Sequence, residues 1–431
     1  MKAKLVLGLV ILLTCIVGFV WPTTLAPLRA GPLSSDIRHA TLPKSMRSTF
    51  DTRHSPAAPP QPTGLIAFHR SGQTFLTWNE VTSLSGEGYH VYRHTASINA
   101  TNISQATRLT TKWGPLPEGS SIYYTERDRG PGGSTYPGLR NYVITDTGPP
   151  LTDTVGLFVW TSQASGNFYY AVTTVQSDTE NLADFAALAS PVAETVADPA
   201  PVLVWQSPSG RGRVYTQFMD WATFNPTFER PTEGLQYAYN YWVGVPTPEQ
   251  CGGTVPAKLP LYLHIEGHSS RYEVGDASSY WCAVEAWNDD PHQSWYYGFS
   301  ANYDYRADGT PAVGPIVNYA EERLLRSLYD TLRNPAYGID AQRVYVYGHS
   351  MGGSGALALG MRYPNVFAAS YSSEPMTNYR TSGDGGGVNW RDDVIPKWGS
   401  VTANLTISNV GRYAAPLAAY NGTGVWDWQN H

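Results

Sequence analysis

Few residues of this chain carry charge. Charged residues make up 15% of the 431 residues, and the formal net charge is −6. A balance this mild gives no electrostatic reason to bind nucleic acid or an anionic membrane, so neither is expected as a partner. No CxxC, HExxH, Walker or dinucleotide-binding motif occurs, so no metal and no cofactor are expected. The hydrophobic fraction of 42% is typical of a globular protein. A chain of 431 residues is too long for one ordinary domain, so roughly two or three domains are expected.

Cysteine is scarce, since the chain has only three. Cys15 lies in an apolar run near the start, which leaves Cys251 and Cys282 further along the chain. In an oxidising compartment such a pair predicts one disulfide bond, and the alternative is two unrelated buried thiols. Neither cysteine has the spacing of a metal ligand or a nucleophile.

The chain begins with the features of an export signal. Residues 1–4 are short and basic, and Leu5–Trp21 is almost entirely apolar. This order is typical of a secretory signal peptide, so we expect residues 1–30 to direct secretion and to be removed. An uncleaved membrane anchor is the alternative, because the apolar run is only slightly shorter than a membrane span. Once the signal is removed, no membrane association is expected.

The first half of the chain predicts a linker and a β domain. Residues 31–62 are rich in proline, serine, threonine and alanine, which cannot build a core. In residues 63–195, short segments such as Gly88–Arg93 have the period-two or β-branched character of strands, and no helical pattern lies between them. This predicts an all-β sandwich. A Pro-x-Gly-Leu opening, a core Trp78, the Gly-Tyr-x-Val-Tyr-Arg segment and a late tyrosine-rich segment resemble a fibronectin type III domain. The resemblance implies a module that spaces a catalytic unit or binds a polymer.

Residues 200–431 have a different pattern, which begins after the proline-rich boundary Asp198–Pro201. The predicted strands are Arg213–Trp221, Tyr237–Val245, Leu261–Ile265 and Arg343–Tyr347, and the predicted helices are Asn318–Leu332 and Ser354–Tyr363. Alternation of strand and helix predicts a mostly parallel sheet with covering helices, after an antiparallel start. In the first helix, the apolar spacing places Glu321 and Glu322 on the outward face.

Gly348-His349-Ser350-Met351-Gly352 fits the G-x-S-x-G pattern of a nucleophile elbow. The pattern alone is weak in a chain with 41 glycines. Its context is more specific, because the β-branched and aromatic residues 344–347 lead directly into it and the small residues 352–356 follow it. A turn of this kind presents the serine hydroxyl at the start of a helix, where free N–H groups can bind an oxyanion. Ser350 is therefore the predicted nucleophile.

The residues around this motif resemble a known family. The run Gly338-Ile339-Asp340-x-x-Arg343-Val344-Tyr345-Val346-x-Gly348-x-Ser350-Met351-Gly352-Gly353, followed by Pro364-x-x-Phe367-Ala368-Ala369, resembles α/β-hydrolase carboxylesterases related to esterase D, feruloyl esterases and polyhydroxybutyrate depolymerases. The resemblance is close over residues 335–370 and loose over 200–335. It implies an ester substrate (polyester, acylated polysaccharide or simple ester), in some cases polymeric, and it leaves the oligomeric state open.

An α/β hydrolase stabilises its oxyanion with two backbone N–H groups. Met351, directly after the predicted nucleophile, supplies the first. The second is expected from Gly267 or His268, in the loop after the strand that ends at Ile265, and the alternative for this loop is an ordinary strand-ending turn. His264 lies within that strand and is expected to be a packed histidine.

The catalytic acid and base follow the serine in α/β hydrolases. The only histidine after Ser350 is His431, the last residue, and Asp427 and Glu374 are the candidate acids. Because a terminal residue is usually poorly fixed, we expect this chain to lack the strands that carry the acid and the base. It would then be nearly inactive, with an exposed sheet edge.

Further aromatic and acidic residues lie between the predicted strands and helices. The aromatic ones are Trp281, Trp287, Trp295, Tyr296, Tyr297 and Phe299. By resemblance they border the substrate cleft, and a buried core is the alternative. Asp289 and Asp290 are interpreted as loop residues. Two other functions stay open: a prolyl-oligopeptidase-like serine peptidase and a non-catalytic adhesion or matrix-binding protein.

Overall fold

The computed structural model describes residues 58–111, 114–123, 138–223, 237–278, 280–301, 303, 316–375, 394–395 and 397–398. The chain divides into two compact units, Met1–Ser55 and Pro56–His431, and every described residue belongs to the second. The predicted signal peptide and most of the predicted linker lie outside the described residues. Among the helices that are described, none has the length and apolar character needed to cross a membrane.

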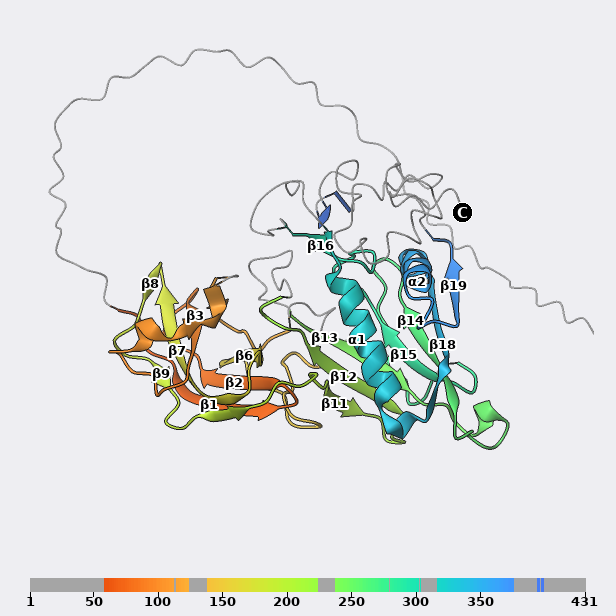
Figure 1. The fold of residues 1–431 in the computed structure, drawn as a ribbon, viewed down its shortest axis with the longest axis horizontal. Coiled ribbons are helices and arrows are strands. Elements are labelled where there is room, and N and C mark those ends of the chain that lie inside the picture. Colours follow the sequence, from red (N-terminus) through yellow and green to blue (C-terminus); the bar gives the residue numbers. More distant parts are fainter. Residues whose placement is uncertain are drawn as a thin grey trace, which may run out of the picture. The chain divides into compact units, whose positions relative to one another are not determined.

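The N-terminal part of the second unit is built from antiparallel strands (Figure 1). One sheet has the order β1-β2-β6, and the other has the order β10-β7-β3-β4, with β5 beside β3 and with β8 and β9 beside β7. The strands are β1 (Thr63–Arg70), β2 (Gln73–Asn79), β3 (Gly88–His94), β4 (Thr107–Arg108), β5 (Leu116–Pro117), β6 (Val155–Thr161), β7 (Gly166–Gln176), β8 (Thr179–Glu180), β9 (Ala186–Ala187) and β10 (Val192–Glu194), with short 3₁₀ turns η1 (Ile103–Gln105) and η2 (Leu109–Thr111). The predicted strands of this region are confirmed, and its likeness to a fibronectin type III domain stays a prediction.

The C-terminal part is organised by one mixed sheet with the order β11-β12-β13-β15-β14-β18-β19. The strands are β11 (Val202–Gln206), β12 (Gly212–Phe218), β13 (Ala238–Gly244), β14 (Leu259–Ile265), β15 (Val284–Asn288), β18 (Ile339–His349) and β19 (Ala369–Ser373), and a separate pair is formed by β16 (Phe299–Ser300) and β17 (Ile316–Val317). The helices are α1 (Tyr319–Arg333), α2 (Met351–Arg362) and the 3₁₀ turns η3 (Glu249–Cys251) and η4 (Pro335–Tyr337).

The prediction of a mostly parallel sheet is wrong for the described strands. In the first half of the sheet, β11 with β12, β12 with β13 and β13 with β15 pair antiparallel. In the second half, β15 with β14, β14 with β18 and β18 with β19 pair parallel. The reason is local, because β11 runs into β12 through a short hairpin, and a hairpin suffices only for antiparallel neighbours. The expected antiparallel start is confirmed, but it extends over half of the sheet.

Helices α1 and α2 lie against the C-terminal sheet (Figure 1), and their buried residues belong to the same apolar cluster as those of β14. Leu324 and Leu328 of α1 and Leu359 of α2 belong to this cluster, as their helical spacing predicts. The outward placement of Glu321 is wrong, since its side chain is buried and forms an ion pair with Arg362 of α2. The partner charge lies on another helix, so a pattern read along α1 alone cannot reveal it.

The two parts of the second unit share a core. Phe75 of β2 lies edge-on to Phe218 of β12, with ring centroids 5.3 Å apart. The backbone N–H of Val159 in β6 donates to the hydroxyl of Tyr237 at 2.9 Å. These contacts bury aromatic surface from both parts against each other, so the residues involved contribute to the stability of both.

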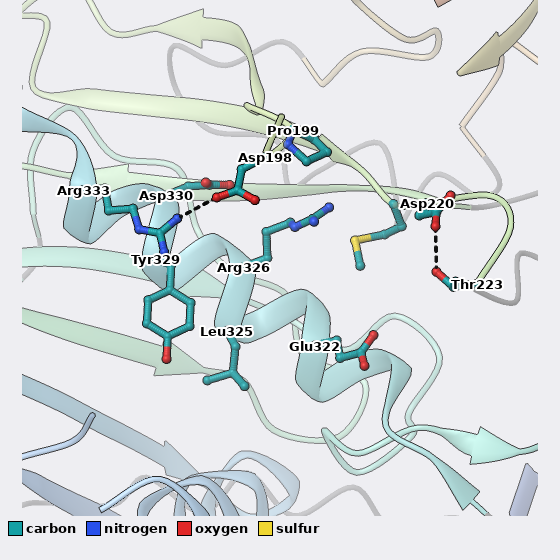
Figure 2. A pocket seen from close by; sticks show the side chains of 11 residues that line it. Asp198, Pro199, Asp220, Thr223, Glu322, Leu325, Arg326, Tyr329, Asp330 and Arg333 are labelled. Carbon is teal, nitrogen blue, oxygen red and sulfur yellow. Dashed lines mark hydrogen bonds and ion pairs between the residues drawn. The ribbon is translucent and has the colours of Figure 1, made fainter. Parts of the chain in front are cut away.

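Two cavities border the C-terminal half of α1. One, of about 350 Å³, is lined by residues that include Asp220, Arg326 and Asp330 (Figure 2). The other, of about 390 Å³, lies beside Tyr215 and Tyr337. Arginines and carboxylates both line the first cavity, and Arg333 forms an ion pair with Asp198 at 3.3 Å.

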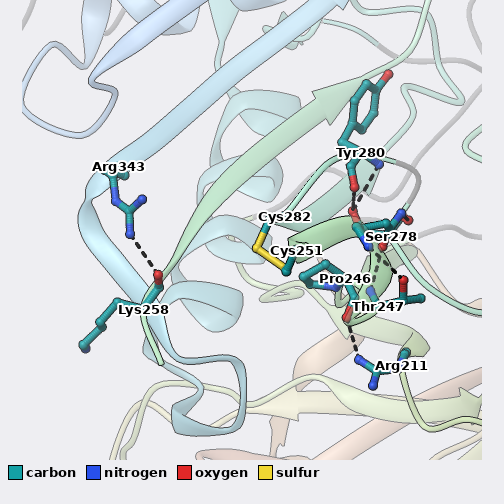
Figure 3. The surroundings of a disulfide bond; sticks show 10 residues. Arg211, Pro246, Thr247, Cys251, Lys258, Ser278, Tyr280, Cys282 and Arg343 are labelled. Atoms are coloured by element: carbon teal, nitrogen blue, oxygen red, sulfur yellow. Dashed lines mark hydrogen bonds between the residues drawn. A yellow bond between two sulfur atoms is a disulfide. The ribbon is translucent and has the colours of Figure 1, made fainter. Parts of the chain in front are cut away.

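Cys251 and Cys282 form a disulfide bond, as the sequence predicts (Figure 3). The bond joins η3 to the residues just before β15, and it closes a loop with a sequence separation of 31 that contains all of β14. The same two segments are also joined by a hydrogen bond of 2.8 Å from the Gln250 side chain to the Ser278 carbonyl.

We predict that the double variant Cys251→Ala/Cys282→Ala loses about 3 to 4 kcal/mol of unfolding free energy, because opening a loop of this length releases chain entropy in the unfolded state. Denaturant unfolding measures the loss. Addition of a reductant to wild type should reproduce it, and the variant should not respond to reductant. Equal stability of the two proteins would contradict the prediction.

A second prediction concerns Glu80, which follows β2 and whose two carboxylate oxygens share one bifurcated hydrogen bond from the Gly119 N–H, at 3.0 and 2.9 Å. Burial is the main cause that raises its pKa to about 7, and the charges of Glu87 and Glu118 act in the same direction. Between the ordinary pKa of 4.5 and about 7, the folded protein therefore holds a proton that the unfolded chain has lost. Stability should fall as pH rises through this window.

The variant Glu80→Gln cannot ionise, so its unfolding temperature should fall less than that of wild type between about pH 5 and about pH 8. Thermal unfolding at both pH values measures this difference. Parallel pH profiles of the two proteins would show that Glu80 does not titrate as described.

Candidate active site

Ser350 occupies the sharp turn between β18 and α2. Its backbone has φ 56° and ψ −118°, a left-handed conformation that costs a residue with a side chain on the order of 1–3 kcal/mol. The Ser350 N–H donates a hydrogen bond of 2.8 Å to the carbonyl of Ser373, at the end of β19. The turn is thus held in its strained form by the neighbouring strand, which is the backbone geometry that the elbow motif predicts.

The glycines around Ser350 are required by close approach of the backbone. A Cβ on Gly352 would lie 2.3 Å from the Ile265 carbonyl oxygen, and one on Gly353 would lie 2.3 Å from the Ser373 carbonyl oxygen. A Cβ on Gly348 would lie 2.4 Å from the backbone of Gly352. No side chain fits at these positions, so helix α2 can begin against the ends of β14 and β19 only because all three residues are glycine.

Gly267 lies beside Ser350. Strands β14 and β18 pair in parallel with Ile265 opposite Gly348, so the residues two positions further on emerge at the same edge of the sheet. An ideal Cβ on Gly267 would lie 3.9 Å from the Ser350 Cβ. The structure therefore brings together two residues that the sequence analysis assigned to one site from separate patterns.

The other two predicted oxyanion residues flank this pair. Met351 is the first residue of α2 and is buried, so its N–H belongs to the free end of the helix. His268 follows Gly267 and its Nδ1 lies 3.1 Å from the Ser269 hydroxyl. Between the two candidates in this loop, Gly267 is the one that the described contacts place against the nucleophile turn.

Glu374, a candidate acid, lies just beyond β19 and close to the elbow. Its carboxylate is 4.0 Å from the Nε2 of His349, and the Nδ1 of His349 is 3.2 Å from the Ser373 hydroxyl. The side chains of His349 and Glu374 are 63% and 81% exposed, so this pair is open to solvent. Asp427 and His431 lie outside the described residues, and their roles stay predictions.

His264 is packed between aromatic rings, as predicted. Its ring stacks on Trp287 at 4.2 Å and on Tyr347 at 4.3 Å between centroids, and its Nδ1 lies 3.2 Å from the buried carboxylate of Glu285. This histidine therefore stabilises the sheet face on which it lies.

The aromatic cluster belongs mainly to the core. Trp295, Tyr296, Tyr297 and Phe299 are buried, Trp287 is half-buried, and Trp281 is 76% exposed. The alternative of a buried core is thus correct for four of the six, because these rings fill the space beside α1 and α2. Nearby, Asp290 accepts hydrogen bonds from the N–H and the hydroxyl of Ser294. No group of acidic, histidine or cysteine side chains suited to a metal ion is found in the part of the chain that the structure describes.

Neither of the two cavities includes a residue of the elbow or of the Gly267 loop. The first is lined by α1 residues from Glu322 to Arg333, and the second lies near η4, where β18 begins, whereas Ser350 follows the end of β18. The candidate site is therefore defined by the backbone geometry of the elbow and not by these cavities.

Residues 288–416 match the family model named Esterase. The matched range contains Ser350, and the match supports an ester-cleaving hydrolase. A comparison with curated proteins found no match.

Among solved structures, the chain is similar to the fluorophosphonate-binding serine hydrolase FphF of Staphylococcus aureus, with 15% identity over 45% of this chain and 70% of that one, at a TM-score of 0.26. It is also similar to an S-formylglutathione hydrolase of Agrobacterium tumefaciens, with 15% identity over 49% of this chain and 71% of that one, at a TM-score of 0.25. Likenesses of this size do not bear on fold or function.

The packing of Gly352 gives a prediction for this site. Gly352→Ala places a methyl group against the Ile265 carbonyl, so it should lower the unfolding free energy by about 1–3 kcal/mol and reduce the reaction of Ser350 with a fluorophosphonate probe. As a control, Gly86→Ala introduces a methyl group where nothing lies within 4 Å. This control carries only the backbone cost of its positive φ, on the order of 1 kcal/mol, and should react like wild type. Unchanged reactivity of Gly352→Ala would show that the elbow accommodates a methyl group at this position and would contradict the close approach of the Ile265 carbonyl.

Proposed function

We propose that this chain is a secreted serine hydrolase that cleaves carboxylic esters through an acyl-enzyme on Ser350. The observation that carries the proposal is the strained backbone of Ser350, with φ 56°, at a strand-to-helix turn that lies against Gly267. Strain of 1–3 kcal/mol is retained where the surrounding structure forces it, and such residues cluster at active sites. The Esterase match over residues 288–416 supports ester hydrolysis as the reaction.

In the proposed reaction, the Ser350 hydroxyl oxygen attacks the ester carbonyl carbon while a histidine accepts the hydroxyl proton. The negative charge on the carbonyl oxygen is stabilised by the N–H groups of Met351 and Gly267. Collapse of this intermediate breaks the bond to the alcohol, which leaves with the proton from the histidine. Water then releases the acid from Ser350 by the same steps. In this proposal His431 is the base, and Asp427 or Glu374 is the acid that orients it. With these residues in place the chain hydrolyses esters at a measurable rate, in contrast to the near inactivity expected if the acid and the base are missing.

Secretion and the role of the N-terminal strands belong to the proposal as well. The apolar start of the chain and the disulfide between Cys251 and Cys282 both support an extracellular protein. The antiparallel sheets β1-β2-β6 and β10-β7-β3-β4 support a fibronectin type III-like module. We propose that this module orients the catalytic part, with which it shares a core. The substrate is a polyester, an acylated polysaccharide or a simple ester.

The proposal predicts that Ser350→Ala abolishes hydrolysis of short-chain p-nitrophenyl esters, by about 10⁴-fold or more, and abolishes labelling by a fluorophosphonate probe. Folding should stay near wild type, because the half-buried hydroxyl of Ser350 has no hydrogen-bond partner among the described residues. Mass spectrometry of the labelled peptide identifies the modified residue. Ser370→Ala is the matched control, since its hydroxyl donates to the Ala356 carbonyl of α2 and takes no part in the proposed reaction.

Labelling of Ser350→Ala at the wild-type level would refute the assignment of the nucleophile. A peptide-amide substrate that is cleaved faster than every ester in the panel would refute the assignment of the reaction.

A further inference from the structure

One tyrosine holds the loop that carries Gly267. The hydroxyl of Tyr296 donates a hydrogen bond of 2.7 Å to the carbonyl oxygen of Glu266. The same loop is held at its outer side by Gln293, whose side-chain amide donates to the Ser269 hydroxyl at 2.9 Å. Residues 293–296 thus contact both ends of the loop that follows β14.

The bond from Tyr296 has a geometric consequence for Gly267. The carbonyl of Glu266 and the N–H of Gly267 belong to the same planar peptide group and point in opposite directions. A donor that fixes the direction of this carbonyl therefore fixes the direction of the Gly267 N–H as well. A hydrogen bond accepted by the carbonyl also polarises the peptide group, which makes its N–H a stronger donor.

Tyr296 is itself held firmly. Its side chain is 2% exposed, and its ring lies against α2, where a Cβ on Gly355 would be 2.8 Å from the Tyr296 Cβ and Cδ2. Its backbone has φ 58°, and its N–H donates to the Asp290 carboxylate at 3.1 Å. Like Ser350, Tyr296 has a left-handed backbone that the surrounding contacts impose.

The hydroxyl of Tyr296 also remains a donor at every working pH. Burial, followed by the charges of Asp290, Asp289 and Glu266, raises the pKa of Tyr296 well above its ordinary value of 10. A neutral phenol that lies next to a carbonyl oxygen can only donate to it.

We propose that Tyr296 is a positioning residue for ester hydrolysis, in which its hydroxyl orients the Glu266–Gly267 peptide so that the Gly267 N–H faces the oxyanion formed at Ser350. This inference rests on the proposed function. It assigns Tyr296 no contact with the substrate, and its effect is exerted through the backbone of Gly267. The interaction is needed in the transition state, where the charge develops, and contributes little to binding of the neutral ester.

The test uses Tyr296→Phe in the full chain, which removes the hydroxyl and keeps the ring that packs on Gly355. The turnover number for a p-nitrophenyl ester should fall about tenfold with KM unchanged, less than the 10²–10³-fold loss typical of removing an oxyanion donor itself. The fluorophosphonate labelling rate should fall by a similar factor. Affinity for phenylboronic acid, which forms a tetrahedral adduct with an active-site serine, should weaken in parallel.

The matched control is Tyr337→Phe. Tyr337 is also buried, and its hydroxyl makes a hydrogen bond of 2.6 Å with the Tyr215 hydroxyl, but it precedes β18 while Ser350 follows the same strand. It should lose comparable thermal stability and keep wild-type kinetics. A second test variant, Gly355→Ala, displaces the Tyr296 ring and should reproduce the fall in turnover, so the inference stays testable if Tyr296→Phe does not fold.

The outcomes separate this inference from the proposed function. Labelling at Ser350 with wild-type turnover and boronate affinity in Tyr296→Phe would overturn the inference and leave the proposed function in place. A rise in KM with unchanged boronate affinity would indicate a role in general packing only, and would also overturn it. If wild type shows no reaction at Ser350, the proposed function fails and the inference fails with it.

Discussion

The parallel pairing of β14 with β18 is the constraint on which the candidate site depends. Its register, with Ile265 opposite Gly348, brings the loop that begins at Glu266 and the turn at Ser350 to the same edge of the sheet. A shift of the register by one residue would reverse the face on which every side chain lies. The buried residues Leu261, Leu263 and Ile265 oppose such a shift, because they would then leave the core. Hydrophobic burial in the strands thereby sets the geometry of the site.

Close backbone packing transmits this constraint to the reactive groups. Helix α2 begins against the ends of β14 and β19 at glycines that leave no room for a Cβ, and the Ser373 carbonyl accepts the Ser350 N–H. On the other side, Tyr296 wedges between α2 and the loop after β14. Several residues with side chains adopt left-handed backbone conformations here, among them Ser350, Tyr296 and Ser269. Backbone strain of this kind persists only where the surrounding contacts stabilise the conformation by more free energy than the strain takes away.

The burial of some charged side chains cannot be predicted from the sequence of a single helix or strand. Glu321 follows the spacing of an outward residue in α1, yet it is 1% exposed and is bound by Arg362 and by the hydroxyl of Tyr363 at 2.7 Å. Glu285 is completely buried in β15 and lies within 3.2 Å of His264 and of the Tyr347 hydroxyl. Charges in such positions are tolerated because partners from other elements satisfy them, and those partners are distant in sequence.

The sequence by itself determined the strands and helices with clear periodicity, the disulfide between Cys251 and Cys282, and the elbow around Ser350. These features depend on the backbone preferences of neighbouring residues and on residue types, such as cysteine and the glycines of the elbow, whose role can be recognised from a short stretch of sequence. Only the tertiary structure decided that β15 lies between β13 and β14, that half of the sheet is antiparallel, and that the Tyr296 hydroxyl holds the loop that carries Gly267. Those facts depend on contacts between residues far apart in the chain. Their free energy comes from burial and hydrogen bonding that no single segment contains.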